Sequence, residues 1–189
     1  MKKILIFLFV IINLKCFSQN GYELKLEAKM DSPYSQYKID LHKTSNKAVV
    51  YILKHTGDLE KKSTRDSLRF DYLIRKQIRN KYENQEIELI KDKYKIYIKD
   101  SVEIALDNPV ISLSDLITNS EKVIREEKLR NKNRIVIDGA LVYLSVLCDN
   151  GYNFSYLFSS PDNEVYSLVY NYWMEILKFY RNSCENPIL

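Results

Sequence analysis

The only two histidines of this 189-residue chain are the first candidates for catalysis or metal binding. His42 and His55 should lie on neighbouring strands, because Ser45 and Asn46 are typical turn residues between two apolar stretches. With that turn, the two rings would be about six residues apart along the strands, or ~20 Å at ~3.3 Å per residue. This separation is too large for one metal ion or one catalytic pair. We therefore expect two solvated strand or turn histidines and no metal site.

Asp138 and Asp149 are the other candidates for chemistry, since each follows a predicted strand. The pairs Asp138-Gly139 and Asn150-Gly151 are, however, those that two-residue hairpin turns favour. We therefore predict turns there rather than catalytic carboxylates. The four glycines do not cluster into a phosphate-binding loop, and the chain has no nucleophile elbow, zinc-protease motif or Cys-x-x-Cys pair. The sequence thus predicts no catalytic residue and no cofactor.

The first 18 residues have the three parts of a cleavable export signal. Lys2 and Lys3 provide a positive start, residues 4–12 are an unbroken apolar stretch of nine, and small residues stand at positions 16 and 18. A membrane-spanning helix needs about 20 apolar residues, so this stretch is too short to anchor the chain. We expect cleavage near Ser18, which leaves a periplasmic or secreted protein of residues 19–189 without a transmembrane anchor.

The end of this leader, Phe17-Ser18-Gln19, resembles the signal peptides of exported Bacteroidota proteins. The alternative is a lipoprotein that carries its lipid on Cys16. Signal cleavage sites need small residues, and the charged Lys15 stands directly before Cys16. We therefore favour the cleaved, unlipidated form.

Most of the net positive charge belongs to the leader. The full chain has 29 lysine and arginine residues against 25 aspartate and glutamate residues. Without Lys2, Lys3 and Lys15 the count is 26 against 25, a net charge of +1. Because nucleic-acid-binding proteins usually carry a strong positive charge, we expect no nucleic-acid partner.

The charge is nevertheless uneven along the chain, because residues 60–99 hold 12 basic and seven acidic residues. We predict that this basic segment contacts a polyanion, an anionic membrane surface or an acidic protein. The alternative is an ordinary solvated helix face. The candidate binding residues are three cations and two tyrosines that we expect to be exposed: Arg75, Lys76, Arg79, Tyr94 and Tyr97.

Two cysteines, Cys148 and Cys184, remain after cleavage of the leader. A lone pair in an oxidising compartment is a disulfide candidate, and this one would join a predicted strand to the last helix. The alternative is a pair of reduced, partly buried thiols.

Apolar periodicity predicts an α+β fold of antiparallel meander strands packed by helices, in a single domain after the leader. The third strand should be the most buried, because it is apolar throughout. Residues 87–98 fit a helix or a strand pair equally well, within a basic, insertion-like segment of residues 60–110. Strands are expected at residues 22–30, 37–41, 48–53, 93–99, 134–137, 140–148 and 152–159. Helices are expected at residues 67–82, at residues 113–124 with Ser112 or Ser114 as the cap, and from Pro161 to Tyr180 as a long amphipathic helix.

Export, a complete set of core-forming patterns and the missing catalytic motifs together favour a non-catalytic binding or interaction module. One alternative is an immunity-type inhibitor of an exported toxin, which rests on likeness of architecture alone. Another is a hydrolase that would pair Asp138 or Asp149 with a second carboxylate.

Overall fold

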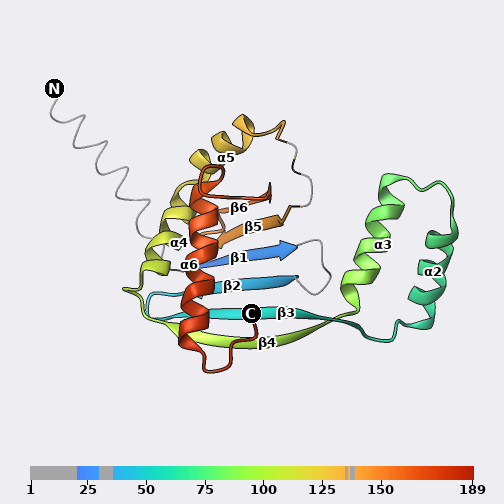
Figure 1. Ribbon diagram of the computed structural model, residues 1–189, viewed down its shortest axis with the longest axis horizontal. Coiled ribbons are helices and arrows are strands. Elements are labelled where there is room, and N and C mark those ends of the chain that lie inside the picture. The colour runs from blue at the N-terminus through green and yellow to red at the C-terminus, as the bar shows by residue number, and fades with distance from the viewer. Residues whose placement is uncertain (1–20, 30–35, 135, 137–138) are drawn as a thin grey trace.

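The computed structural model describes residues 21–29, 36–134, 136 and 139–189. Within them, one antiparallel sheet of six strands lies at the centre, in the order β4-β3-β2-β1-β5-β6 (Figure 1). The predicted α+β fold is therefore confirmed, together with its long C-terminal helix. The strands are β1 (Tyr22–Lys29), β2 (Tyr37–Lys43), β3 (Ala48–Leu59), β4 (Lys95–Ile104), β5 (Leu141–Cys148) and β6 (Asn153–Ser159). The helices are α2 (Thr64–Arg75), α3 (Lys81–Lys93), α4 (Pro109–Asn119), α5 (Glu121–Arg130) and α6 (Ser167–Ser183).

The sheet buries one of its faces, because α4, α5 and α6 all lie on the same side of it (Figure 1). Side chains alternate between the two faces of a strand, so β1 buries Tyr22, Leu24 and Leu26 and leaves the charged residues between them accessible. The prediction that the third strand is the most buried is wrong. Its Tyr51 points to the uncovered face and is 41 % exposed.

The hairpin of β2 and β3 has the predicted register, with His42 opposite Val49. Strand β3 does not end at residue 53, however, but continues to Leu59 beside β4. The register shifts between His55 and Leu59, where Gly57 has a φ of 92°. A bulge of this kind bends a strand, and the left-handed conformation favours glycine. The bulge therefore marks the point where the chain leaves the sheet.

The helix predicted over residues 67–82 is in fact the end of α2, a turn, and the start of α3. Asn80 begins α3: its side chain accepts the N–H of Glu83, and the Glu83 carboxylate accepts the N–H of Asn80. This capping box satisfies two N–H groups that a helix start leaves unpaired. The ambiguous residues 87–98 complete α3 and then form the first part of β4 from Lys95.

The helix predicted over residues 113–124 is likewise two helices, α4 and α5, which meet at Ser120. The cap of α4 is Asn108, whose side chain accepts the N–H of Val110. Proline at the first helical position strengthens this start. Ser114, one of the two predicted caps, is instead a fully buried residue of the helix.

Helix α6 buries the predicted apolar face but begins at Ser167, six residues after Pro161. The Asp162 carboxylate accepts the backbone N–H groups of Glu164 and Val165. Aspartate side chains that bond nearby N–H groups in this way favour turns over helices, which explains the late start. The buried side of α6 is formed by Val169, Tyr172, Trp173, Ile176, Leu177 and Tyr180.

The second meander contains β5 and β6, and β5 also pairs with β1 along its length. Gly151 supplies the turn, with a φ of 83° and its N–H bonded to the Cys148 carbonyl at 2.9 Å. The strand predicted at residues 134–137 does not form at Arg134 or Val136, and its other residues lie outside the described part of the chain. Asp138 of the predicted Asp-Gly turn lies outside it as well.

Candidate functional site

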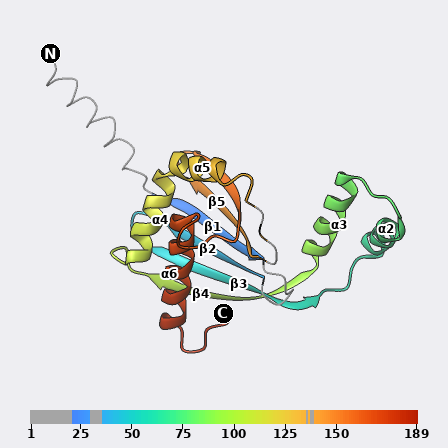
Figure 2. The ribbon, with the colours of Figure 1, turned by 45° about the horizontal axis from the view of Figure 1, so that its top comes forward.

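Residues 60–94, which we call the arm, project from the ends of β3 and β4 and stand apart from the sheet in both views (Figure 1, Figure 2). The arm has a small core of its own, with Phe70 packed against four buried residues. The main core beneath the sheet contains none of these residues. The arm is therefore a separate packing unit. Its buried residues are Leu73, Ile87, Ile90 and Tyr94.

Ion pairs hold the two helices of the arm together. Three cations lie 2.6 Å from a carboxylate across the arm: Arg69 from Glu86, Lys76 from Glu83 and Lys93 from Asp66. The hydrogen bond from the partner cation lowers the pKa of each of these carboxyl groups below its usual range. Much of the basic charge predicted for this segment is thus neutralised within the arm.

The free end of the arm is basic and apolar at once. Residues 74–82, which we call the tip, contain four cations and no carboxylate. Ile78 is 84 % exposed and Tyr82 is 79 % exposed, the two highest values among the exposed large apolar residues. The four cations are Arg75, Lys76, Arg79 and Lys81.

The cations of the tip differ in what they contact. Lys76 is paired with Glu83, and Arg79 donates to the carbonyl groups of Leu73 and Ile74 at 3.3 and 3.4 Å, which caps the end of α2. Arg75 and Lys81 form no ion pair with any residue of the described ranges. The structure therefore brings the three predicted cations together, and it adds Lys81 as a fourth that sequence reasoning did not single out.

The two predicted tyrosines do not belong to the tip, and the expectation that they are exposed is wrong. Tyr94 is buried in the core of the arm, where its hydroxyl accepts the N–H of Ser63 at 3.0 Å and donates to Asp66 at 2.6 Å. Tyr97 lies in β4 with its ring 5.6 Å from that of His55. Partial burial raises the pKa of Tyr97 to about 12. Both rings support the base of the arm.

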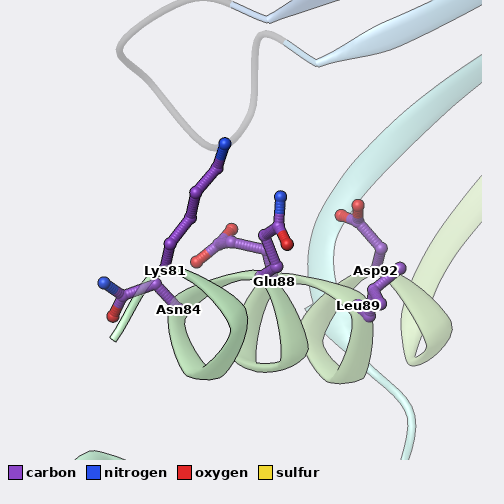
Figure 3. A pocket seen from close by; sticks show the side chains of 6 residues that line it. Lys81, Asn84, Glu88, Leu89 and Asp92 are labelled. Atoms are coloured by element: carbon purple, nitrogen blue, oxygen red, sulfur yellow. The ribbon is translucent and has the colours of Figure 1, made fainter. Parts of the chain in front are cut away.

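A hollow of about 800 Å³ runs along one side of α3 (Figure 3). Lys81 stands at one end of it, the Asp92 carboxylate lies toward the other, and the Glu88 side chain lies between them. The lining residues are spaced at helical intervals on one face of α3, and their charges are of both signs. The hollow is open, and its lining carries both positive and negative side chains. It therefore lacks a set of groups that would match one class of ligand.

The two histidines occupy different environments. His42 lies on the uncovered face of the sheet, where its ring is 3.0 Å from the Glu23 carboxylate. His55 was expected to be solvated but is only 4 % exposed, because β3 continues past it and the Tyr97 ring covers it. Its ring nitrogen lies 3.2 Å from the Asp58 carbonyl oxygen. Among the described residues, no group of three or more histidine, cysteine or carboxylate side chains could hold a metal ion.

No disulfide joins Cys148 to Cys184, so the candidate bridge does not form and the alternative of two partly buried thiols applies. Cys184 follows α6 and lies beside Asp100 in β4, and burial together with this neighbour raises the pKa of its thiol. Cys148 is in β5, which is four strands away from β4 in the sheet. At ~4.8 Å per strand the two positions are ~19 Å apart, whereas a disulfide needs Cα atoms within about 7 Å.

Of the two candidate carboxylates, Asp138 and Asp149, the structure describes only Asp149. Asp149 lies in the exposed turn between β5 and β6, and its N–H bonds to the Gly21 carbonyl at 3.1 Å. Asp138 is outside the described residues, and so are residues 1–20, on which the predicted leader falls. No helix of the described ranges is long and apolar enough to cross a membrane.

Comparisons of the chain with protein-family models, with curated proteins and with solved structures find no match. The arm and its tip are therefore characterised by their geometry alone.

Proposed function

We propose that this protein is an exported, non-catalytic interaction module that binds an anionic surface of a partner through the tip of its arm. One observation carries the proposal: the tip combines four cations and no carboxylate with the most exposed apolar side chains, Ile78 and Tyr82. Isolated exposed apolar residues are ordinary, but apolar side chains gathered among polar ones mark interaction surfaces.

The two kinds of side chain would act at different stages of binding. Cations such as Arg75 and Lys81 attract an anionic partner over a distance and orient it. Burial of Ile78 and Tyr82 then stabilises the complex, by about 1.5–3 kcal/mol for each large side chain that loses contact with water. The ion pairs between α2 and α3 keep the arm ordered before binding, so that less conformational entropy is lost.

Retention of the full-length protein on a heparin column, with heparin as the polyanion probe, tests the proposal. Arg75 and Lys81 are replaced together by glutamine, because neither has an ion-pair partner among the residues that the structure describes. We expect this variant to elute at clearly lower salt than the unmodified protein. Lys76 and Arg79 are left in place because they hold the arm together.

The matched control replaces Lys122 and Lys178 by glutamine, which removes the same charge from exposed positions on α5 and α6. The control should elute close to the unmodified protein. If the two double variants elute at the same salt concentration, retention reflects net charge only, and the tip is not the binding surface.

A further inference from the structure

A cavity of about 350 Å³ lies between α5 and the end of β6, on the body of the protein rather than on the arm. Four cations from α5 and the chain that follows it line the cavity, together with two tyrosines. The six residues that matter are Arg125, Lys128, Lys132, Arg134, Tyr156 and Tyr166. We propose that this cavity binds a small anion with two or more negative charges, of the phosphate or carboxylate type.

None of the described residues that line the cavity is acidic. Three carboxylates contact residues of the lining. Glu121 accepts the hydroxyl of Tyr156 at 2.5 Å, Glu127 accepts the backbone N–H of Tyr166 at 2.6 Å, and Asp162 pairs with Arg134 at 2.9 Å. Among the described residues, the lining thus contains four cations and no carboxylate, and the three carboxylates that contact lining residues are not part of it.

Two of the four cations are fixed in position by backbone carbonyl groups. Arg134 donates to the carbonyls of Ser159 and Ser160 at 2.7 and 2.8 Å, and Lys128 donates to that of Leu157. A carbonyl group carries no net charge, so this contact positions Lys128 without neutralising it, whereas Arg134 is also paired with the Asp162 carboxylate. A ligand would thus meet charges that are already positioned.

The other two cations, Arg125 and Lys132, form no ion pair with a described residue. They are the groups whose charge is available to a ligand. Arginine binds phosphate and carboxylate groups through two parallel hydrogen bonds, and lysine adds a compact charge. Together they match an anion that presents several oxygens.

The backbone beside the cavity is strained in two places. Tyr166 has a φ of 60° and Ser160 a φ of 46°, and they are the only described residues other than glycine with a positive φ. A left-handed conformation costs about 1–3 kcal/mol for such residues, and it recurs at ligand sites because it places side chains that ordinary backbone would not. Here it occurs at a residue that lines the cavity.

The size of the cavity limits the ligand to a small molecule, since about 350 Å³ is near the lower end for ligand pockets. The tyrosine rings and the side chains of Leu129 and Leu157 add flat and apolar surface to the cationic wall. A phosphate ester and a polycarboxylate both fit this description. Pyrophosphate and citrate are suitable probes to distinguish them.

Isothermal titration of the full-length protein with each probe, at constant ionic strength, tests the proposal. We expect saturable binding of at least one probe to a single site. Replacing Arg125 and Lys132 together by glutamine should weaken that binding by about tenfold or more, because two charge-assisted contacts are lost. Neither side chain is an anchor of the fold, so the urea midpoint of this variant should stay unchanged.

The matched control replaces Lys122 and Arg130 by glutamine, one lysine and one arginine of α5 that do not line the cavity. It should bind like the unmodified protein. Binding of pyrophosphate alone identifies a phosphate site, and binding of citrate alone identifies a polycarboxylate site. Absence of saturable binding for both probes, or equal weakening in the control, overturns the proposal.

Discussion

Tyr22 shows how a single polar group connects two layers of this fold. Its hydroxyl donates to the Asp115 carboxylate of α4 at 2.8 Å and lies 2.5 Å from the buried Ser114 hydroxyl. Lys43 of β2 contacts the same carboxylate oxygen of Asp115 at 2.5 Å. Burial raises the pKa of Tyr22 well above its ordinary value, so the group remains neutral and able to donate. The network therefore ties α4 to the sheet.

We expect Tyr22→Phe to lower the free energy of unfolding by about 1–2 kcal/mol, because the substitution keeps the ring and removes buried hydrogen bonds. Urea unfolding followed by the fluorescence of Trp173 measures this change. The control is Tyr152→Phe, at a tyrosine that is 42 % exposed, which should change stability by less than about 0.5 kcal/mol. Equal effects of the two substitutions would contradict a structural role for the Tyr22 network.

At the scale of residues, the sequence predicted the register of the β2–β3 hairpin better than the burial of single side chains. It predicted an exposed His42, which the structure confirms, but it misplaced Tyr94, whose amphipathic ring suits a surface or a core equally. The candidate disulfide does not form because of the strand order in the sheet. The distance between Cys148 and Cys184 depends on the order of the strands in the sheet, and the spacing of cysteines in the sequence carries no information about that order.

At the scale of elements, the arm depends on charge to an unusual degree. Its core contains few buried residues, and three carboxyl groups with lowered pKa join its helices. A group whose pKa is lower in the folded state contributes stability above its unfolded pKa and loses that contribution as the pH falls through the folded value. The arm should therefore weaken in acid.

We expect the amide hydrogens of α2 and α3 to exchange faster as the pH falls from about 5 to about 2, relative to those of the central strands after correction for intrinsic rates. Hydrogen exchange with mass spectrometry measures the difference. Glu86→Gln should reproduce part of the effect at neutral pH, whereas Glu126→Gln on α5 should not. Loss of protection in the sheet before the arm would contradict the expectation.

The elements themselves were predictable where the apolar pattern is unbroken, as in β1 and on the buried side of α6. The breaks between α2 and α3 and between α4 and α5 could not be predicted in this way. Around both breaks, apolar residues continue at helical spacing, so periodicity predicts one helix where two exist. The deciding groups are polar: Asn80 starts α3 with a capping box, and Asn119 bonds to the Asp115 carbonyl at the end of α4.

At the scale of the whole molecule, the described residues form two hydrophobic cores that share no residue. The main core holds the sheet and its three helices, and the small core holds the arm. The sequence predicted a basic insertion in this region, although not its form. The position of the tip depends on the length of α2, on the turn before Asn80 and on the bulge at Gly57, and none of these has a periodic signature.

The body should fold without the arm. Replacing residues 57–95 by Asn-Gly would join Thr56 to Ile96 through a two-residue hairpin turn and keep His55 opposite Tyr97. We expect cooperative urea unfolding, followed by the fluorescence of Trp173, with a midpoint close to that of the full chain, and loss of most heparin retention. A molten or unfolded product would show instead that the arm is needed to form the sheet.

Strand β6 forms one outer edge of the sheet, and two of its carbonyl groups, those of Leu157 and Ser159, already accept hydrogen bonds from Lys128 and Arg134. Exposed strand edges are where copies of a protein join into aggregates. A copy that approached β6 as an additional strand would first have to displace two cations. We therefore expect that a substitution of Lys128 or Arg134, which frees this edge, promotes self-assembly at high protein concentration.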